Sequence, residues 1–227
     1  WGDELVTKKI VDPSRDGYTF VRWQTNTGEG IPTSGQIETT EFSAVWLKHP
    51  EEKVAVFDRT NLTTSEKEQV KQKIYDANPD LSTGVAQVIK AIDISATGEA
   101  TVTFDDGAAV KVPSATLTNE DKDTARSNAK AEIEKVATEK SDDIKASNLT
   151  EEEKTARLTK VRDANDRANI AIDKAATTED LTEAISDGTA AIKAVSTTNT
   201  IKTKAKQALE EAYNAKKDEI DNSSLTA

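Results

Sequence analysis

The feature that most constrains this chain is a short phrase that recurs along it. The phrase reads NLTTSEK at 61–67, TLTNEDK at 116–122 and NLTEEEK at 148–154, and LTA at 225–227 matches the opening of a further copy. In each full copy a threonine is followed three residues later by an acidic residue. This spacing is typical of a capping box, in which two side chains satisfy free N–H groups at the start of a helix. The phrase therefore predicts helix starts at Thr63, Thr118 and Thr150, each preceded by a leucine that packs on the first turn.

A longer repeat covers the C-terminal part of the chain. Residues 129–150 align without a gap to residues 205–226, at a spacing of 76 residues. Ile133 corresponds to Leu209, and Ile144 corresponds to Ile220. A period of this length is typical of an array in which each unit is one block of packed elements. We expect one complete helical repeat at 118–196 and the first helix of the next repeat at 197–227.

Apolar residues at helical spacing predict three amphipathic helices in the complete repeat. The expected seam positions are Ala129, Ile133, Val136, Lys140 and Ile144 in the first helix, Leu158, Val161, Asn165, Ala168, Ile172 and Ala175 in the second, and Leu181, Ile185, Gly188, Ile192 and Val195 in the third. Three such helices joined by short polar links form an antiparallel bundle. The stretch STTNT at 196–200 has four Ser or Thr residues, which are poor helix formers. We expect a weak continuous helix or a short break there, acting as a flex point between repeats.

The N-terminal half has a different pattern. Residues 1–49 show no helical period, and the turn-forming stretches at 12–17, 25–30 and 33–35 separate strand-like runs at 18–23 and 41–47. We expect a small β-rich core built from the aromatic residues, with an aromatic sugar-binding platform as the alternative. Residues 50–117 predict a strand at 53–58, a helix after Thr63 and three strands at 88–94, 99–104 and 108–112. A helix packed on a three-strand meander is the expected module.

Three resemblances follow from these residues. The stretch at 12–47, with Tyr18, Phe20, Trp23 and Trp46 on the pattern, resembles the Listeria-Bacteroides repeat of internalin B-repeat type; this implies a β-grasp-like fold, of which the first module is a truncated copy. Residues 50–117, ending in TFDDGAAVKVP, are similar to short modules of streptococcal and staphylococcal wall-anchored proteins. Residues 118–227 resemble the helical repeat of unknown function in the extracellular matrix-binding family of giant surface proteins. Together they imply a Gram-positive, extracellular, cell-wall-anchored adhesin, whose anchor lies outside this sequence.

Composition narrows the functional classes. The chain has 35% hydrophobic and 31% charged residues, which suits several thin cores better than one large core. The absence of Cys and Met excludes disulfides and thiolate chemistry and suits an oxidising exterior. The net charge of −11 opposes binding to nucleic acid or to anionic membranes. We expect a monomer of multi-module architecture, in which β-rich and α+β modules precede an all-α three-helix bundle repeat.

The sequence offers little for catalysis. His49 is the only histidine, and it lies before a proline between two modules, so we interpret it as a linker residue and reject a Ser-His-Asp arrangement. The acidic pairs Asp105–Asp106 and Asp142–Asp143 fall in a turn and on a charged helix face, where structural roles are expected. No phosphate loop, zinc spacing or calcium loop is present in the sequence. We therefore predict no catalytic, cofactor or metal site and no enzyme activity.

Two functional hypotheses from different classes survive. The first is a structural stalk that displays a distal binding region away from the cell wall. The second is an adhesin module whose helical bundle binds a host plasma or extracellular-matrix protein. Interface hot spots are enriched in Trp, Tyr and Arg, yet residues 118–227 contain one aromatic residue, Tyr213. This distribution favours the stalk.

Overall fold

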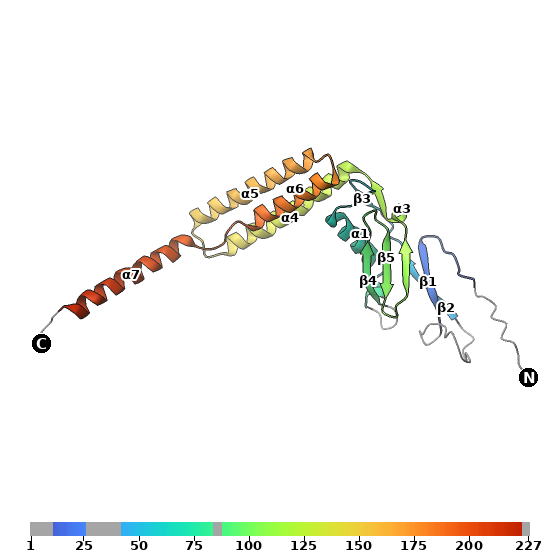
Figure 1. The fold of residues 1–227 in the computed structure, drawn as a ribbon, viewed down its shortest axis with the longest axis horizontal. Helices are drawn as coiled ribbons and strands as arrows, with labels where there is room; N and C mark the ends of the chain where they lie inside the picture. The colour runs from blue at the N-terminus through green and yellow to red at the C-terminus, as the bar shows by residue number, and fades with distance from the viewer. Residues whose placement is uncertain (1–10, 26–41, 84–87, 224–227) are drawn as a thin grey trace, which may run out of the picture. The chain divides into compact units, whose positions relative to one another are not determined.

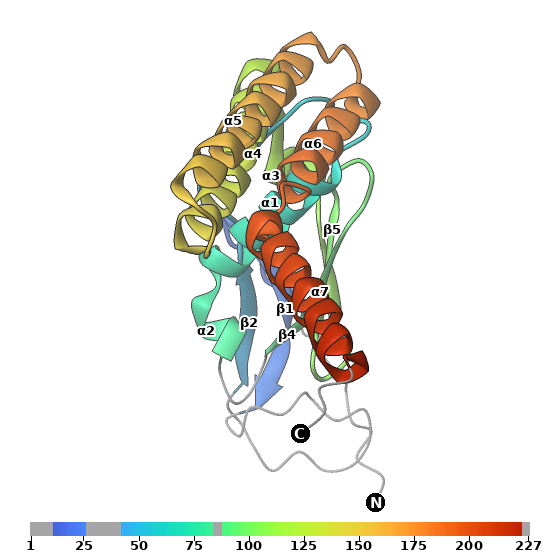
Figure 2. The same ribbon diagram turned by 90° about the vertical axis from the view of Figure 1, so that its left-hand side faces the viewer.

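The computed structural model describes residues 11–25, 42–83 and 88–223. Three expected features lie outside the described residues: the turn at 25–30 except for its first residue, the turn at 33–35, and the LTA phrase at 225–227. The chain divides into two compact units, residues 1–129 with 175–182 and residues 130–174 with 183–227. Small sheets come first along the chain and long helices follow (Figures 1 and 2). The predicted class, β-rich and α+β modules followed by an all-α bundle, is confirmed.

The first described element is an antiparallel hairpin of β1 (Tyr18–Thr25) and β2 (Phe42–Lys48). Its aromatic side chains pack edge to face, with ring centroids 6.3 Å apart for Tyr18 and Trp46 and 5.7 Å apart for Phe20 and Trp46. These rings are only half-buried, however, and the buried residues of β2 are Val45 and Leu47. The expectation of an aromatic core was therefore wrong, because the opposite face of the hairpin is the one covered: Leu47 belongs to the core of the module that follows.

The α+β module contains two sheets and one main helix. The sheet of β4 (Ile89–Ile94), β5 (Ala100–Phe104) and β6 (Ala109–Val112) is an antiparallel meander, as predicted. Helix α1 (Thr64–Ala77) packs against β4 and against β3 (Val54–Val56). Along the chain, the short helices α2 (Pro79–Thr83) and α3 (Ser114–Leu117) precede and follow the meander. Thirteen buried side chains form the core: Leu47, Val54, Val56, Leu62, Val70, Ile74, Ile89, Ile92, Ala100, Val102, Phe104, Val112 and Leu117.

The predicted capping box at Thr63 is confirmed. The Thr63 Oγ1 accepts a hydrogen bond from the Glu66 N–H at 3.1 Å, and the Glu66 Oε2 accepts one from the Thr63 N–H at 2.8 Å. The preceding Leu62 is 3% exposed and belongs to the core. The phrase therefore both starts α1 and anchors the chain in the module.

The predicted helix start at Thr118 is wrong. Residues Thr118–Glu120 form strand β7, which pairs in parallel with β3, and helix α4 begins at Lys122. Asp121 caps this helix, because its Oδ1 accepts a hydrogen bond from the Thr124 N–H at 3.0 Å. The physical reason is competition: the Thr118 backbone is used by the pairing with Val54, and its hydroxyl donates to the Ser114 carbonyl at 3.0 Å.

Three helices form the bundle: α4 (Lys122–Ala146), α5 (Glu151–Lys174) and α6 (Thr178–Lys193). Figures 1 and 2 show them side by side. The capping box at Thr150 is confirmed, since the Glu153 N–H donates to Thr150 Oγ1 at 3.2 Å and the Thr150 N–H donates to Glu153 Oε2 at 3.0 Å. None of the helices in the described part of the chain has the length and apolar run that crossing a bilayer requires.

The bundle seam agrees with the prediction at most positions and differs at five. The buried residues along the three helices include Ala125, Ala129, Ile133, Ala137, Ile144, Val161, Ala164, Ala168, Ile172, Leu181, Ala184, Gly188 and Ile192. The expected seam residues Val136, Lys140, Leu158, Asn165 and Ile185 are instead half-buried at its margin. The buried positions combine small residues, alanine and Gly188, with large isoleucine and leucine side chains that are at most 1% exposed.

A final helix, α7 (Thr200–Asn222), follows a break after Lys193. Of the two alternatives predicted for STTNT, the structure shows the short break. Asn199 caps α7 by accepting from the Lys202 N–H at 2.6 Å, and its side-chain amide donates to the Asn148 carbonyl at 3.0 Å. Lys202 Nζ also reaches the Asn148 carbonyl, at 3.4 Å. The break is therefore tied to the α4–α5 loop, while its predicted flexibility stays a prediction.

Candidate functional site

The start of the helical bundle and the α+β module share the first compact unit, since residues 175–182 and the first two turns of α4 belong to it. We call the contacts among these parts the junction, formed by Phe57, Asn61, Lys122, Arg126, Ala175 and Glu179. The sequence patterns identified Ala175 only as a seam position of the second helix, and they identified none of these residues as a contact between modules. The junction is nevertheless the place where the two kinds of module are joined.

Phe57 lies at the centre of the junction. It is 1% exposed, although it does not belong to the core of the α+β module. The Lys122 Nζ and the Arg126 Cζ each lie 5.0 Å from the centroid of its ring. Cations within about 6 Å of an aromatic face are attracted to it. The first turns of α4 therefore place two cations against the buried ring of Phe57, which directly follows β3.

Two hydrogen bonds extend these contacts to the α5–α6 link. Arg126 Nη2 donates to the Ala175 carbonyl at 2.9 Å, and Asn61 Nδ2 donates to Glu179 Oε1 at 2.8 Å. The second bond joins residues 118 positions apart in the sequence. The junction thus connects the α+β module to the beginning of both α4 and α6.

Glu66 holds Phe57 in place from the other side. Its carboxylate is part of a buried residue, 4% exposed, and its Oε1 accepts a hydrogen bond from the Phe57 N–H at 2.6 Å. The same carboxylate accepts from Thr63 through Oε2. A capping residue expected from the sequence therefore has a second, long-range role, which fixes the backbone of Phe57 to the start of α1.

Two aspartates stabilise helix starts at this end of the bundle. Asp180 Oδ2 accepts hydrogen bonds from the Ala176 and Thr177 N–H groups, both at 3.0 Å, and these bonds hold the pKa of Asp180 below its usual 3.8. The hydroxyl and N–H of Thr124 lower the pKa of Asp121 in the same way. The Asp180 cap was missed from the sequence, although its Thr-x-x-Asp spacing is the same signal that identified the others.

The residues considered for catalysis have structural partners. His49 lies just after β2, where its N–H donates to the Gly17 carbonyl at 2.8 Å and its Nε2 lies 2.7 Å from Thr19 Oγ1; burial lowers its pKa. Asp106 forms an ion pair with Arg22 of β1, and Asp142 forms one with Lys145 at 2.9 Å. Within residues 11–25, 42–83 and 88–223, no group of three or more His, Cys, Asp or Glu residues is arranged to hold a metal ion.

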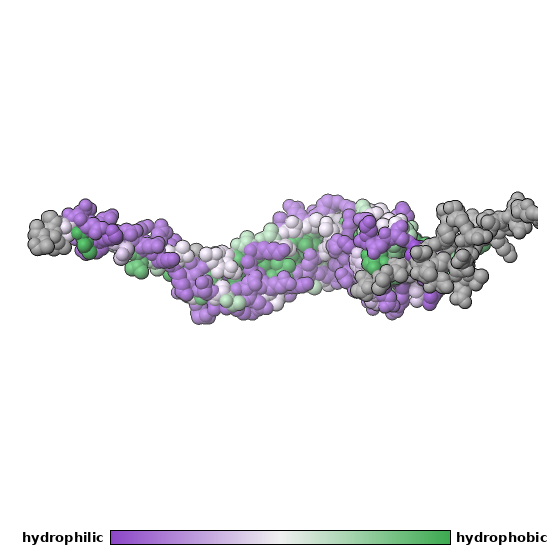
Figure 3. Space-filling view, turned by 90° about the horizontal axis from the view of Figure 1, so that it is seen from below, coloured by the Kyte–Doolittle hydropathy of each residue, from purple (hydrophilic) through white to green (hydrophobic). Residues whose placement is uncertain are grey.

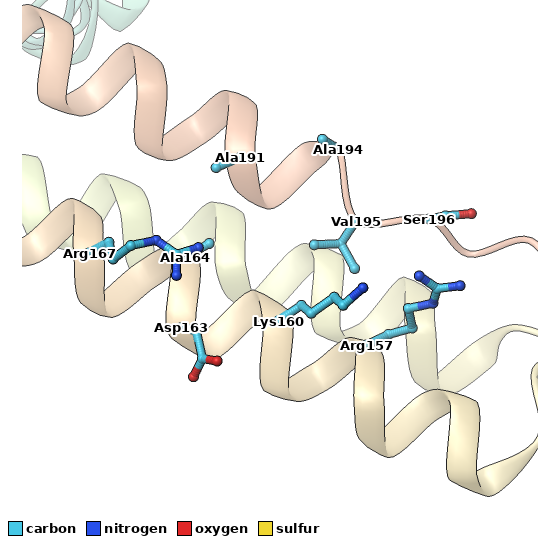
Figure 4. Close-up of a pocket in the computed structure, with 9 residues that line it drawn as sticks. All are labelled: Arg157, Lys160, Asp163, Ala164, Arg167, Ala191, Ala194, Val195 and Ser196. Carbon is cyan, nitrogen blue, oxygen red and sulfur yellow. The ribbon is translucent and has the colours of Figure 1, made fainter.

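An open groove of about 420 Å³ lies on the bundle between α5 and the end of α6 (Figure 4). Arg157 and Lys160 extend toward the segment at Val195 and Ser196, whereas Asp163 points away from it. Among the described residues, no ion-pair partner is found for the three cations Arg157, Lys160 and Arg167. The rest of the lining is Ala164, Ala191, Ala194, Val195 and Ser196. Cationic side chains around an apolar floor suit an acidic ligand.

Helix α7 carries an exposed apolar stripe, which we call the open seam. Its members are Ile201, Leu209, Tyr213 and Ile220, which are 56%, 72%, 67% and 54% exposed. Green side chains interrupt the purple surface of this helix in Figure 3. At the 76-residue spacing these positions correspond to Ala125, Ile133, Ala137 and Ile144, all buried in the bundle. The open seam therefore repeats, position by position, the buried face of α4.

Comparison with family models agrees with this division into sheet module and helical repeat. Residues 45–124 match the model of the atypical Rib domain, and residues 125–200 match a domain of unknown function, DUF1542. Both are repeat domains of Gram-positive surface proteins, so the chain is associated with surface adhesins and with an extracellular location. The resemblance of the N-terminal part to a Listeria-Bacteroides module stays a prediction. Comparison with curated proteins gave no match.

Several solved structures are similar to part of the chain. The GspB Siglec domain is 28% identical with a TM-score of 0.29, over 33% of this chain and 38% of that one. The SrpA adhesin from Streptococcus sanguinis is 21% identical with a TM-score of 0.27, over 35% and 42%. The sialic acid binding region of a Streptococcus sanguinis SK1 adhesin, bound to 3'sLn, is 18% identical with a TM-score of 0.28, over 36% and 23%. The chain spans less than half the length of these structures, and likenesses at this level carry no weight for function.

Proposed function

We propose that this chain is a spacer segment of a cell-wall-anchored surface adhesin, which holds a distal binding region away from the cell wall. The observation that carries the proposal is the junction, where the buried ring of Phe57 lies beside Lys122 and Arg126 of the helical repeat. A spacer must resist bending where its modules meet, and a linker without contacts would not do so. At this joint the buried ring and the long-range hydrogen bond from Asn61 to Glu179 oppose bending.

The serial order of the modules supports the same function. We propose a β-rich module at 1–49, an α+β module at 50–117, a helical repeat at 118–196 and the first helix of a further repeat at 197–227. The open seam of α7 supports the last of these, because an exposed apolar stripe on a helix that copies a buried one implies an equivalent cover. Repeats that bury their cores one after another add length in a regular way.

Distance measurement by electron paramagnetic resonance tests the stiffness of the junction. The chain has no cysteine, so spin labels at Lys90→Cys and Ser127→Cys, both exposed positions of the first compact unit, would be the only labels. We expect a narrow distance distribution in the otherwise unchanged chain and a broad one after Phe57→Ala. Val70→Ala is the matched control, since it removes a buried side chain from the core of the same module and leaves the junction intact. A broad distribution before any junction substitution would refute a stiff spacer.

The groove on the bundle favours a second candidate function, direct binding of a host plasma or extracellular-matrix protein through an acidic surface. Arg157→Glu with Lys160→Glu would then abolish binding of the chain to such a protein in biolayer interferometry. The matched control is Lys135→Glu with Lys206→Glu, which makes the same charge change at exposed positions outside the groove. Equal loss with both pairs would indicate a general charge effect, and no saturable binding before substitution would leave the spacer as the function.

A further inference from the structure

The open seam of α7 differs from the buried seam of α4 most strongly at one position. Tyr213 stands where α4 has Ala137, while Leu209 and Ile220 stand where α4 has residues of similar size. Ala137 is 5% exposed, so its methyl group is already enclosed in the bundle. The question is whether the bundle could accept a tyrosine at that level.

Contacts between side chains fix the register of the three helices. Lys130 pairs with Asp173 at 2.6 Å, and Asn165 donates to Glu134 at 2.7 Å, so α4 and α5 run antiparallel with these residues side by side. A Cβ atom added to Gly188 would lie 2.5 Å from the Cβ of Ala168 and 3.2 Å from the Cδ1 of Ile133. Gly188, Ala168 and Ile133 therefore lie at one level of the bundle, which is packed to contact distance.

Position 137 lies one helical turn beyond this level. Following the antiparallel register by one turn brings it to the level of Ala164 on α5 and Ile192 on α6. These two residues are 3% and 0% exposed. Because α5 already contributes only a methyl group there, space for a larger residue on the first helix could come only from the position of Ile192.

We propose that α7 binds a helical hairpin of the α5–α6 type in which the residue equivalent to Ile192 is smaller than isoleucine. This inference rests on the proposed function, in which α7 opens a further repeat, and it adds the size rule that selects its partner. Tyr213 fits a hairpin that has a small residue at the equivalent position, so α7 can pack on its own hairpin. If α7 took the place of α4 in the present bundle, Tyr213 would clash with Ile192. Such a mismatch opposes exchange of helices between neighbouring repeats, a common route to misassembly in repeat proteins.

The chain itself provides the first test. Ala137→Tyr should lower the melting temperature of the bundle by at least about 5 °C, because overpacking a filled core is destabilising. The double variant Ala137→Tyr with Ile192→Ala should lose less melting temperature than the sum of the losses in the two single variants. Tyr213→Ala, at an exposed position, should leave the melting temperature unchanged. An Ala137→Tyr chain as stable as the original would overturn the size rule.

The second test supplies the partner. Residues 1–226 are followed by a copy of residues 151–200, with either isoleucine or alanine at the position equivalent to Ile192. Both versions are made with and without Tyr213→Ala, and the readouts are calorimetry and hydrogen exchange of the α7 amides. With Tyr213 present, we expect the alanine version to melt at least about 5 °C higher than the isoleucine version. After Tyr213→Ala, we expect the isoleucine version to melt higher than the alanine version.

The outcomes separate the two proposals. The size rule would be overturned if the α7 amides were protected in all four chains and the same version, alanine or isoleucine, melted higher both with Tyr213 and with Tyr213→Ala. That result would still support α7 as the first helix of a further repeat. No protection of α7 in any chain would overturn both, because α7 would then not be the first helix of a repeat. Protection of the α7 amides, with an order of the two melting temperatures that reverses on Tyr213→Ala, supports both the size rule and the repeat arrangement.

Discussion

Gly188 gives the sharpest test of how the bundle is packed. Replacing it by alanine adds one methyl group to α6, and helix propensity alone predicts a gain of about 1 kcal/mol for this change. The structure predicts the opposite sign. The new Cβ would lie 2.5 Å from the Cβ of Ala168, an atom fixed to the α5 backbone, so relief requires the two helices to separate. A contact between carbon atoms is comfortable at about 3.5–4.0 Å, and the separation needed is therefore about 1 Å.

The cost of that separation sets the magnitude. Overpacking a core by one or a few methylene groups destabilises by about 1–3 kcal/mol, and a displaced helix also loosens the contact with Ile133. After subtracting the propensity gain of about 1 kcal/mol, we expect Gly188→Ala to destabilise the bundle by up to about 2 kcal/mol, which corresponds to as much as roughly 16 °C in melting temperature for a domain of this size.

The matched partner substitution is Ala168→Gly. Alone it should destabilise, because it removes a buried methyl group and introduces glycine into α5. Together with Gly188→Ala it moves the single methyl group from one helix to the other, so the double change should be more stable than the sum of the singles by at least about 1 kcal/mol. Hydrogen exchange of the α5 and α6 amides reports the bundle separately from the α+β module. A stabilised Gly188→Ala chain, or strict additivity of the two changes, would refute the close approach.

Three further outcomes follow from the described contacts. Glu66→Ala should destabilise the α+β module by about 3 kcal/mol, because it leaves two buried N–H groups without an acceptor, whereas the exposed Glu68→Ala should change the urea midpoint little. The lowered pKa of Asp180 predicts a stabilisation that is fully present above the unfolded pKa of 3.8 and is lost as the pH falls through the lower folded pKa. Asp180→Asn should therefore make the free energy of unfolding fall less steeply at acid pH. An unchanged slope at acid pH would contradict this. Asn78→Ala should accelerate hydrogen exchange at Lys48, since the Asn78 side chain accepts from the Lys48 N–H at 2.8 Å and donates to its carbonyl at 2.9 Å, and exchange at the original rate would refute that link.

The sequence by itself determined the local starts and periods of the helices. The boxes at Thr63 and Thr150 could be identified because both partners lie within three residues, so that their hydrogen bonds form whenever the helix forms. The 76-residue repeat likewise paired positions of α4 with positions of α7 without any structure. The seam was predicted less exactly within the bundle, where half-buried and fully buried positions differ by one residue, as for Val136 and Ala137.

Only the tertiary structure decided which capping-box phrase does not start a helix and which residues form the contact between modules. The phrase at Thr118 has the same spacing as its two counterparts, yet β3 uses its backbone for a parallel pairing across more than 60 residues of chain. Phe57 falls near the end of an ordinary predicted strand, and the sequence around it does not show that Lys122 and Arg126 of α4 lie beside its buried ring. The physical reason is the same in both cases: capping depends on neighbours in the sequence, whereas strand pairing and the junction depend on groups that the folded chain brings together from far apart.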